Sequence, residues 1–247
     1  MERSLCVDQR FFFIRVAVIR VVSDPSAGTV AKGFIIASPV VIVPRKRRTQ
    51  AERTEDTRAA LISAAIVVLY RHGYNGATTA AIADEAGVSR GSIIYQFNTR
   101  AQLMSEVINF VYEQEQEQYV ALAQQGFDLS RPEQWPELLW KVFSQPAGMA
   151  VIEILQASRS DPELAALVIP TQERVEQSSV EAIMRWIPGD IEQTRATVRL
   201  FVWAIRGLAL SQVLSQDAVE TEQAVRLFGK IVGRANIAGG QASTAQT

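Results

Sequence analysis

Hydrogen-bonding side chains are concentrated in one short segment of the chain, between residues 89 and 96. Arg90, Ser92, Tyr95 and Gln96 lie close together there. None of them forms a nucleophile–base pair, so their chemistry is directional hydrogen bonding. An arginine can bind both acceptors on the edge of a guanine, and hydroxyl groups can bind phosphate. The segment therefore indicates contacts with base edges and phosphates in the major groove of double-stranded DNA.

The side chains that enzymes use most often for nucleophilic or acid–base chemistry are scarce. The chain has one histidine, His72, and one cysteine, Cys6. We interpret His72 as a helix-end residue, and a single cysteine excludes an internal disulfide. The sequence shows no metal-ligand spacing, phosphate-binding glycine loop or nucleophile elbow. These observations argue against an enzyme, predict neither metal nor cofactor, and fit a protein of the reducing cytoplasm.

Three helices are expected to position the hydrogen-bonding segment. Apolar residues at helical spacing predict a first helix over residues 54–72. Thr78-Thr79 offers an N-cap hydroxyl for a second helix, Gly87 permits a sharp turn, and Ser89 offers an N-cap for a third helix. Two helices joined by a short turn that contains glycine form a helix-turn-helix, here over residues 78–97.

Small, apolar and hydroxyl residues recur at fixed spacing across this region. The positions concerned are Gly73, Tyr74, Thr78, Thr79, Ile82, Ala83, Ala86, Gly87, Val88, Ser89, Gly91, Ile93, Phe97, Thr99, Arg100 and Leu103. This pattern resembles the N-terminal signature of the TetR/AcrR transcriptional regulators. The resemblance implies an all-α fold, with a three-helix helix-turn-helix DNA-binding domain over residues 55–115 and a C-terminal helical ligand-binding and dimerisation domain.

The resemblance also implies roles for individual residues. Thr78, Thr79 and Tyr95 would touch phosphate or base, and Arg100 stands where a lysine usually contacts the DNA backbone. The chain departs from the pattern at Ile94, where members of the family commonly have tyrosine. It also departs at Gln96, where they have histidine or tyrosine.

A basic run, Pro44–Arg48, precedes the first helix. It is either a solvated tail or an arm that lies along phosphates or in a minor groove. The predicted DNA-binding residues are Arg47, Thr78, Thr79, Ser89, Arg90, Gly91, Ser92, Tyr95, Gln96 and Arg100.

Further helical blocks fill residues 116–237, which we interpret as the ligand-binding and dimerisation domain. A long helix is expected over residues 100–124, with its Glu113–Gln118 run on a wet face. Thr197–Leu214 is apolar nearly all round, and such a helix is buried on every side. Two arginines argue against a membrane span. The apolar helix at Thr197–Leu214 and a second apolar helix at Thr221–Ile231 together predict the four-helix seam of a homodimer.

Aromatic residues are abundant in the C-terminal region, and some are expected to line a cavity for an unidentified small molecule. Glu153 and Arg206 are charges in apolar surroundings, and each needs a partner. They line the cavity, pair with each other, or reach solvent. The predicted pocket residues are Trp140, Phe143, Glu153, Trp186, Trp203 and Arg206.

The two ends of the chain differ from its helical middle. Residues 1–43 contain an apolar stretch, Phe11–Val22, which is too short for a membrane span and is interrupted by arginines. We interpret this region as an extension outside the core fold, with Val43 a candidate first residue of the native protein. An arm or a membrane-surface patch is the alternative. Residues 238–247 are expected to be a disordered tail.

Charge is distributed unevenly along the sequence. Residues 43–100 carry nine Lys/Arg against five Asp/Glu, whereas residues 101–247 carry eleven against eighteen. A basic block ahead of an acidic block is expected of a DNA-contacting module joined to a second module. The favoured function is a repressor that binds a palindromic operator as a homodimer and is released by a small molecule. A ligand-independent regulator or an activator of the same fold remains the alternative.

Overall fold

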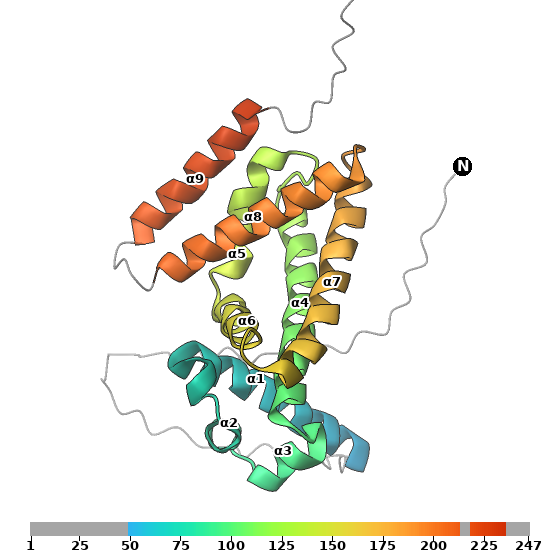
Figure 1. Cartoon of the computed structure of the whole chain (residues 1–247), viewed down its shortest axis with the longest axis vertical. Coiled ribbons are helices and arrows are strands. Elements are labelled where there is room, and N and C mark those ends of the chain that lie inside the picture. The colour runs from blue at the N-terminus through green and yellow to red at the C-terminus, as the bar shows by residue number, and fades with distance from the viewer. Residues whose placement is uncertain (1–48, 213–217, 236–247) are drawn as a thin grey trace, which may run out of the picture. The chain divides into compact units, whose positions relative to one another are not determined.

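The computed structural model describes residues 49–212 and 218–235, which form helices joined by short connections (Figure 1). The expected all-α fold is confirmed over these two ranges. The predicted N-terminal extension, which includes Arg47, and the predicted tail at 238–247 lie outside the described residues. The elements are α1 (Gln50–Gly76), α2 (Thr79–Ala86), α3 (Arg90–Phe97), α4 (Arg100–Gln124), the 3₁₀ turn η1 (Pro132–Gln134), α5 (Trp135–Phe143), α6 (Pro146–Ala157), α7 (Pro162–Met184), α8 (Ile191–Ser211) and α9 (Ala218–Ala235).

Local side-chain chemistry determines where the N-terminal helices begin and end. The hydroxyl of Thr78 accepts from the N–H of Ala81 at 3.2 Å, and the hydroxyl of Ser89 accepts from the N–H of Ser92 at 3.3 Å. The expected N-cap at Ser89 is therefore confirmed, and of the expected pair Thr78-Thr79 it is Thr78 that caps α2. Gly87 follows α2 with φ 65° and ψ 30°, a left-handed conformation that glycine adopts without steric cost. The helix-turn-helix forms from these three local devices.

One hydrophobic core joins the N-terminal helices to the C-terminal ones. Leu61 of α1, Ile82 of α2 and Leu103 of α4 are fully buried in the same cluster as Ile154 of α6 and Leu164 of α7. Since interiors are close-packed, a shift of α4 or α6 must disturb the packing beneath the helix-turn-helix. A second set of contacts packs α8 and α9 against α5, with the rings of Trp135 and Phe201 meeting edge to face at 5.3 Å.

Helix α8 is less buried than its composition predicts. Phe201 and Ile205 are buried, yet Leu200 and Trp203 expose 59% and 51% of their surface in the single chain. These two residues lie on the side of α8 that is not packed against α5. An apolar helix face without cover is consistent with the expected dimer seam, to which we return below.

The structure was also searched for helices that could cross a membrane. Within residues 49–212 and 218–235 no single helix is long and apolar enough, although η1–α5 and α6 together reach that length and composition with a bend of 86° between them.

Candidate DNA-reading helix and ligand cavity

Helix α3 presents one polar face and one buried face. Ile93 and Phe97 are buried in the core beneath it. Arg90 is exposed at its first turn, and Tyr95 exposes 76% of its surface. Ile94 beside it is also exposed, and sequence reasoning noted this position only as a departure from the family pattern. The exposed face therefore offers a cation, a phenol and an aliphatic side chain to a partner.

Two hydrogen bonds fix α3 against its neighbours. The side-chain amide of Gln96 donates to the carbonyl of Thr54 in α1 at 3.1 Å. Arg58 donates to the carbonyl of Gln96 at 3.3 Å and forms an ion pair with Glu106 of α4 at 2.7 Å. A partly buried ion pair with an additional hydrogen bond restrains orientation more than it adds stability. The exposed face of α3 is thus held in a defined direction.

A polar hollow lies between α3 and the start of α1. It brings together five of the predicted DNA-binding residues with four that sequence reasoning missed, because the latter look like ordinary helix-surface positions. The lining residues are Gln50, Arg53, Thr54 and Thr57 from α1 and Ser89, Gly91, Ser92, Tyr95 and Gln96. Thr78 is exposed at the start of α2, and Thr79 is half-buried next to it.

Arg100 makes contacts inside the protein that the resemblance did not imply. Its Nε donates to the carbonyl of Ala77 at 2.9 Å, and a second guanidinium nitrogen donates to the carbonyl of Tyr74. The guanidinium also lies 3.9 Å from the centre of the Tyr74 ring. The last carbonyls of a helix lack intrahelical donors, which explains why a cation is bound there. The sequence did not predict this internal role, and a contact between Arg100 and phosphate stays a prediction.

Glu153 does not line the cavity, contrary to expectation. Its Oε2 accepts from the backbone N–H of Tyr74 at 2.9 Å. Gly73, with φ 66° and ψ 178°, interrupts α1 just before that N–H, so the amide needs a partner outside the helix. A carboxylate of α6 therefore satisfies the backbone of α1. Trp140 is also absent from the cavity wall, because it is buried in the cluster that packs α5 against α8 and α9.

A cavity of about 250 Å³ lies between α4, α5, α7 and α8. Four of the predicted pocket residues line it: Phe143, Trp186, Trp203 and Arg206. Its wall also includes residues that sequence reasoning did not select, notably Tyr112, Glu115 and Gln172. The hydroxyl of Tyr112 donates to the side chain of Gln172 at 2.5 Å, which connects α4 to α7 across one side of the cavity.

The sequence predicted that the Glu113–Gln118 run lies on a solvent-exposed face of α4, and this prediction is wrong at Glu115. This residue retains 6% of its exposure, and its burial raises the pKa of the carboxyl to about 7 against the opposing charge of Arg206. The cause is helical geometry: Glu115 follows Val111 and precedes Tyr119 by four residues, so it lies on the buried stripe. Alternating Glu and Gln cannot all share one side of a helix.

Arg206 is the second buried charge of the cavity. It exposes 4% of its surface, and its guanidinium lies 4.9 Å from the ring centre of Phe143, 5.6 Å from that of Trp203 and 5.9 Å from that of Tyr112. Its Nη1 and the Oε1 of Glu115 are buried without a hydrogen-bond partner among the residues that the structure describes. Arg206 and Glu153 do not pair with each other, which was one of the alternatives that the sequence left open, since Glu153 contacts α1.

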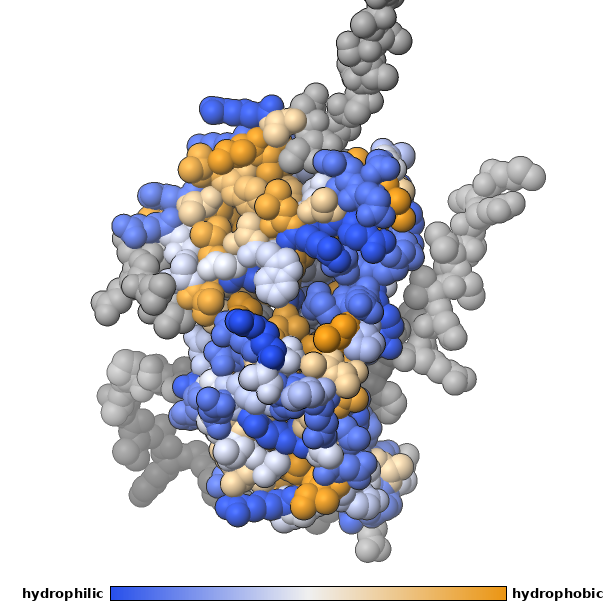
Figure 2. Space-filling view, viewed as in Figure 1, coloured by the Kyte–Doolittle hydropathy of each residue, from blue (hydrophilic) through white to orange (hydrophobic). Residues whose placement is uncertain are grey.

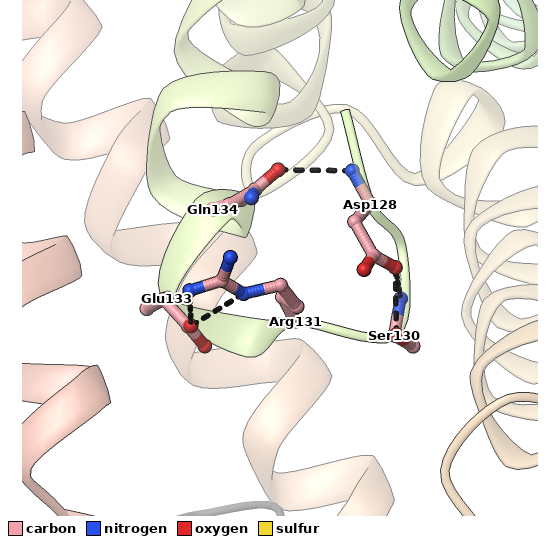
Figure 3. A network of polar contacts seen from close by, with 5 residues as sticks. All are labelled: Asp128, Ser130, Arg131, Glu133 and Gln134. Carbon is pink, nitrogen blue, oxygen red and sulfur yellow. Dashed lines mark hydrogen bonds and ion pairs between the residues drawn. The ribbon is translucent and has the colours of Figure 1, made fainter. Parts of the chain in front are cut away.

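The connection from α4 to α5 closes one end of the cavity. Asp128 accepts from the N–H and hydroxyl of Ser130 at 2.9 Å and 2.6 Å, and its own N–H donates to Gln134 at 2.9 Å (Figure 3). These contacts with Ser130 lower the pKa of Asp128. The indole of Trp135 donates to the carbonyl of Leu129 at 3.1 Å, and both of these residues line the cavity.

Comparison with known proteins agrees with this architecture. Residues 61–107 match the family model described as bacterial regulatory proteins, tetR family. The chain is 45% identical over 69 residues to the HTH-type transcriptional regulator CymR of Pseudomonas putida, a match that spans 28% of this chain and 34% of that protein. It is 29% identical over 188 residues to the HTH-type transcriptional regulator TtgR of Pseudomonas putida, covering 70% of this chain and 88% of the relative.

A solved structure shows the same fold. NalD of Pseudomonas aeruginosa, described as the secondary repressor of the MexAB-OprM multidrug efflux pump, is 20% identical with a TM-score of 0.53, covering 74% of this chain and 96% of that one. Helix-turn-helix geometry, the matched family model and two regulators of transcription as relatives agree, and residues 61–107 form the N-terminal domain of the tetR family of bacterial regulatory proteins.

Proposed function

We propose that the protein is a repressor that binds a palindromic operator as a homodimer and leaves it when a small molecule enters the cavity. The observation that carries this proposal is the shared core of the two parts. Helix α4 begins beneath the reading helix, where Arg100 binds the end of α1, and continues to the cavity wall at Glu115. One rigid element therefore touches both places.

For the DNA contacts, the exposed face of α3 supports a division of roles. Arg90 at the first turn of α3 is suited to a bidentate contact with guanine, since the N-terminal residues of a recognition helix meet base edges. Ile94 is suited to the methyl group of a thymine. Tyr95, Thr78 and the α1 side of the polar hollow are suited to phosphates, which fix register without reading sequence.

The homodimer is supported by the uncovered apolar faces of α8 and α9. Figure 2 shows hydrophobic side chains gathered over these two helices. Leu200, Trp203 and Leu210 follow one stripe of α8, and Leu227 and Ile231 follow one stripe of α9, with exposures between 39% and 59%. A two-fold axis through these stripes would bury both copies against each other as a four-helix seam.

Release by a ligand is supported by the contacts at the end of α1, next to the helix-turn-helix. A ligand that moves α4 or α6 acts on Arg100 and on Glu153, and both hold the end of α1. Packed interfaces respond to such movement by small rigid shifts of helices, which would change the spacing of the two reading helices in a dimer.

The test begins with selection of duplexes from random DNA by the purified full-length protein. We expect an inverted repeat whose half-sites are about 10 base pairs apart, centre to centre, or a multiple of that spacing. Fluorescence anisotropy on the selected duplex, with and without compounds from a chemically diverse panel, then measures release. Selection of a non-repeated site by a monomer would contradict the proposed mode of binding, and a panel without any releasing compound would contradict ligand control.

A further inference from the structure

We propose that α3 recognises a thymine of the operator: the 5-methyl group of the base enters a notch above Gly91 and packs against the side chain of Ile94. This inference rests on the proposed operator binding and specifies which feature of the operator the reading helix recognises. It concerns this chain in particular. A tyrosine, common at position 94 in the family that the sequence resembles, could bind a phosphate through its hydroxyl, whereas isoleucine offers only apolar surface.

The backbone of α3 is open to a partner at Gly91. A methyl group added there would meet only the hydroxyl oxygen of Ser89, at 3.7 Å, among the described residues outside its own stretch of helix. Gly148 of α6 differs, because a methyl group there would collide with the carbonyl oxygen of Phe143. The fold therefore requires glycine at position 148 but not at position 91. Glycine also serves where a ligand approaches the backbone closely, and Gly91 is exposed.

Ile94 forms one wall of this notch. It follows Gly91 by three residues in α3, and residues at that spacing are neighbours on a helix surface. Ile94 exposes 65% of its surface, whereas Ile93 beside it exposes 2%. A single exposed isoleucine is ordinary on a protein surface. Here it adjoins an open backbone on the face that α3 turns outward, so it offers an apolar contact to whatever that face binds.

Arg90 places the notch relative to a second base. Arg90 and Ile94 are four residues apart, so their Cβ atoms lie about 5–6 Å from each other on one side of α3. Successive bases of one strand are about 3.4 Å apart along the duplex axis. A guanine bound by Arg90 and the thymine at Ile94 are therefore expected within about two base pairs of each other.

The chemistry of the major groove identifies the group that Ile94 contacts. The 5-methyl group of thymine is the apolar group on the base edges there, and the other edges present hydrogen-bond donors and acceptors. Deoxyribose is the alternative apolar surface, and it is the same in every sequence. We favour the base because Ile94 shares one side of α3 with Arg90 and does not line the polar hollow that Tyr95 lines.

The experiment compares duplexes that differ only in methyl groups. Each thymine of the selected duplex is replaced by uracil at one position at a time, in both half-sites, and fluorescence anisotropy measures the dissociation constant of the full-length protein. We expect one thymine position in the half-site at which uracil weakens binding about ten- to twentyfold, since each of the two buried methyl groups contributes a factor of roughly four.

Variants of Ile94 assign this preference to its side chain. Ile94→Ala should reduce the preference for thymine over uracil at that position to within about twofold. Ile94→Val lacks only the terminal methyl group and should keep most of the preference. Ile169→Ala removes an isoleucine of α7 with 53% exposure, and it should keep the full preference.

Gly91→Ala tests the notch itself. The added methyl group takes the space of the thymine methyl group, so this variant should bind the thymine duplex more weakly than the unaltered protein does. It should also bind the uracil duplex more tightly than the thymine duplex, which reverses the preference. Its melting temperature should be kept or raised, because alanine is the better helix former. A lower melting temperature would show that the fold itself requires glycine there, and would overturn the notch.

Two outcomes would overturn the thymine contact and leave the proposed operator binding intact. One is a selected duplex in which no thymine can be replaced by uracil with a loss of affinity. The other is an undiminished preference for thymine in Ile94→Ala, or a loss that is equal on thymine and uracil duplexes, which would place Ile94 against deoxyribose. Failure to select any duplex would contradict the proposed function and this inference together.

Discussion

Replacing Glu115 with glutamine is expected to change how stability depends on pH. The carboxyl has a pKa of about 7 in the folded protein against 4.5 for an ordinary glutamate. Between these values the folded state holds a proton that the unfolded state has lost, so unfolding becomes easier as the pH rises. The difference corresponds to about 3 kcal/mol, lost between about pH 4.5 and pH 8. Glutamine cannot ionise and does not carry this loss.

The assay is urea unfolding of both proteins at several pH values and at one fixed protein concentration, since a dimer's apparent stability depends on concentration. We expect the free energy of unfolding of Glu115→Gln, minus that of the unaltered protein, to grow by about 3 kcal/mol across the window. For a domain of this size, that difference corresponds to a gain in melting temperature of about 6–12 °C.

The pH-dependent part of this difference isolates one carboxyl. Burial raises the pKa of the neighbouring Tyr112 and Tyr119, so neither tyrosine titrates within the window. Glu176 also lines the cavity, paired with Arg199 at 2.9 Å, and it is common to both proteins. Glu117→Gln, on the exposed side of α4, is the matched control for the substitution itself. A flat difference for Glu115→Gln would refute the burial of that carboxyl.

Three further predictions concern DNA binding, assembly and the junction between the two parts. Arg90→Ala should reduce the free energy of binding to the selected duplex by about 1–3 kcal/mol and relax the preference at one base pair. Tyr95→Phe should weaken binding less than this, and by the same amount for every duplex. Fluorescence anisotropy on selected and scrambled duplexes distinguishes the two effects. Leu227→Glu should dissociate the dimer in sedimentation, because a symmetric seam loses about 1.5–3 kcal/mol of apolar burial in each copy and gains two buried charges; an unchanged dimer would contradict the seam. Glu153→Ala should destabilise the protein by about 1–3 kcal/mol in urea because the N–H of Tyr74 loses its acceptor, and Glu153→Gln, which keeps a carbonyl oxygen, should cost less.

Features that depend on neighbouring residues could be predicted from the sequence. Thr78, Ser89 and Gly87 act within three residues of their own positions, so the caps and the turn of the helix-turn-helix follow from residue type alone. The same holds for Asp161, which accepts from the N–H of Leu164 at 3.0 Å to begin α7, with Pro162 at the first helical position. Such devices work in any fold that contains the segment.

Features that depend on helix register or on distant residues could not be predicted in this way. The run Glu113–Gln118 has a polar composition throughout, and only the register of α4 puts Glu115 on the buried stripe. Arg206 was selected correctly as a buried charge, but its aromatic neighbours come from α4, α5 and α8. A sequence pattern identifies a charge that needs a partner without identifying that partner.

The contact between Glu153 and Tyr74 shows why the two kinds of feature must be combined. Gly73 is recognisable in the sequence as a helix-ending residue, and its left-handed backbone leaves the next N–H without an acceptor. The sequence therefore indicates an N–H group that lacks a local acceptor, but the acceptor itself comes from α6, 79 positions away. Tyr74 also receives Arg100 from α4 on its carbonyl and donates from its hydroxyl to Asp161 at 3.3 Å. Residues from α6, from α4 and from the N-cap of α7 therefore all contact Tyr74 near the end of α1, and α4 and α7 also line the cavity.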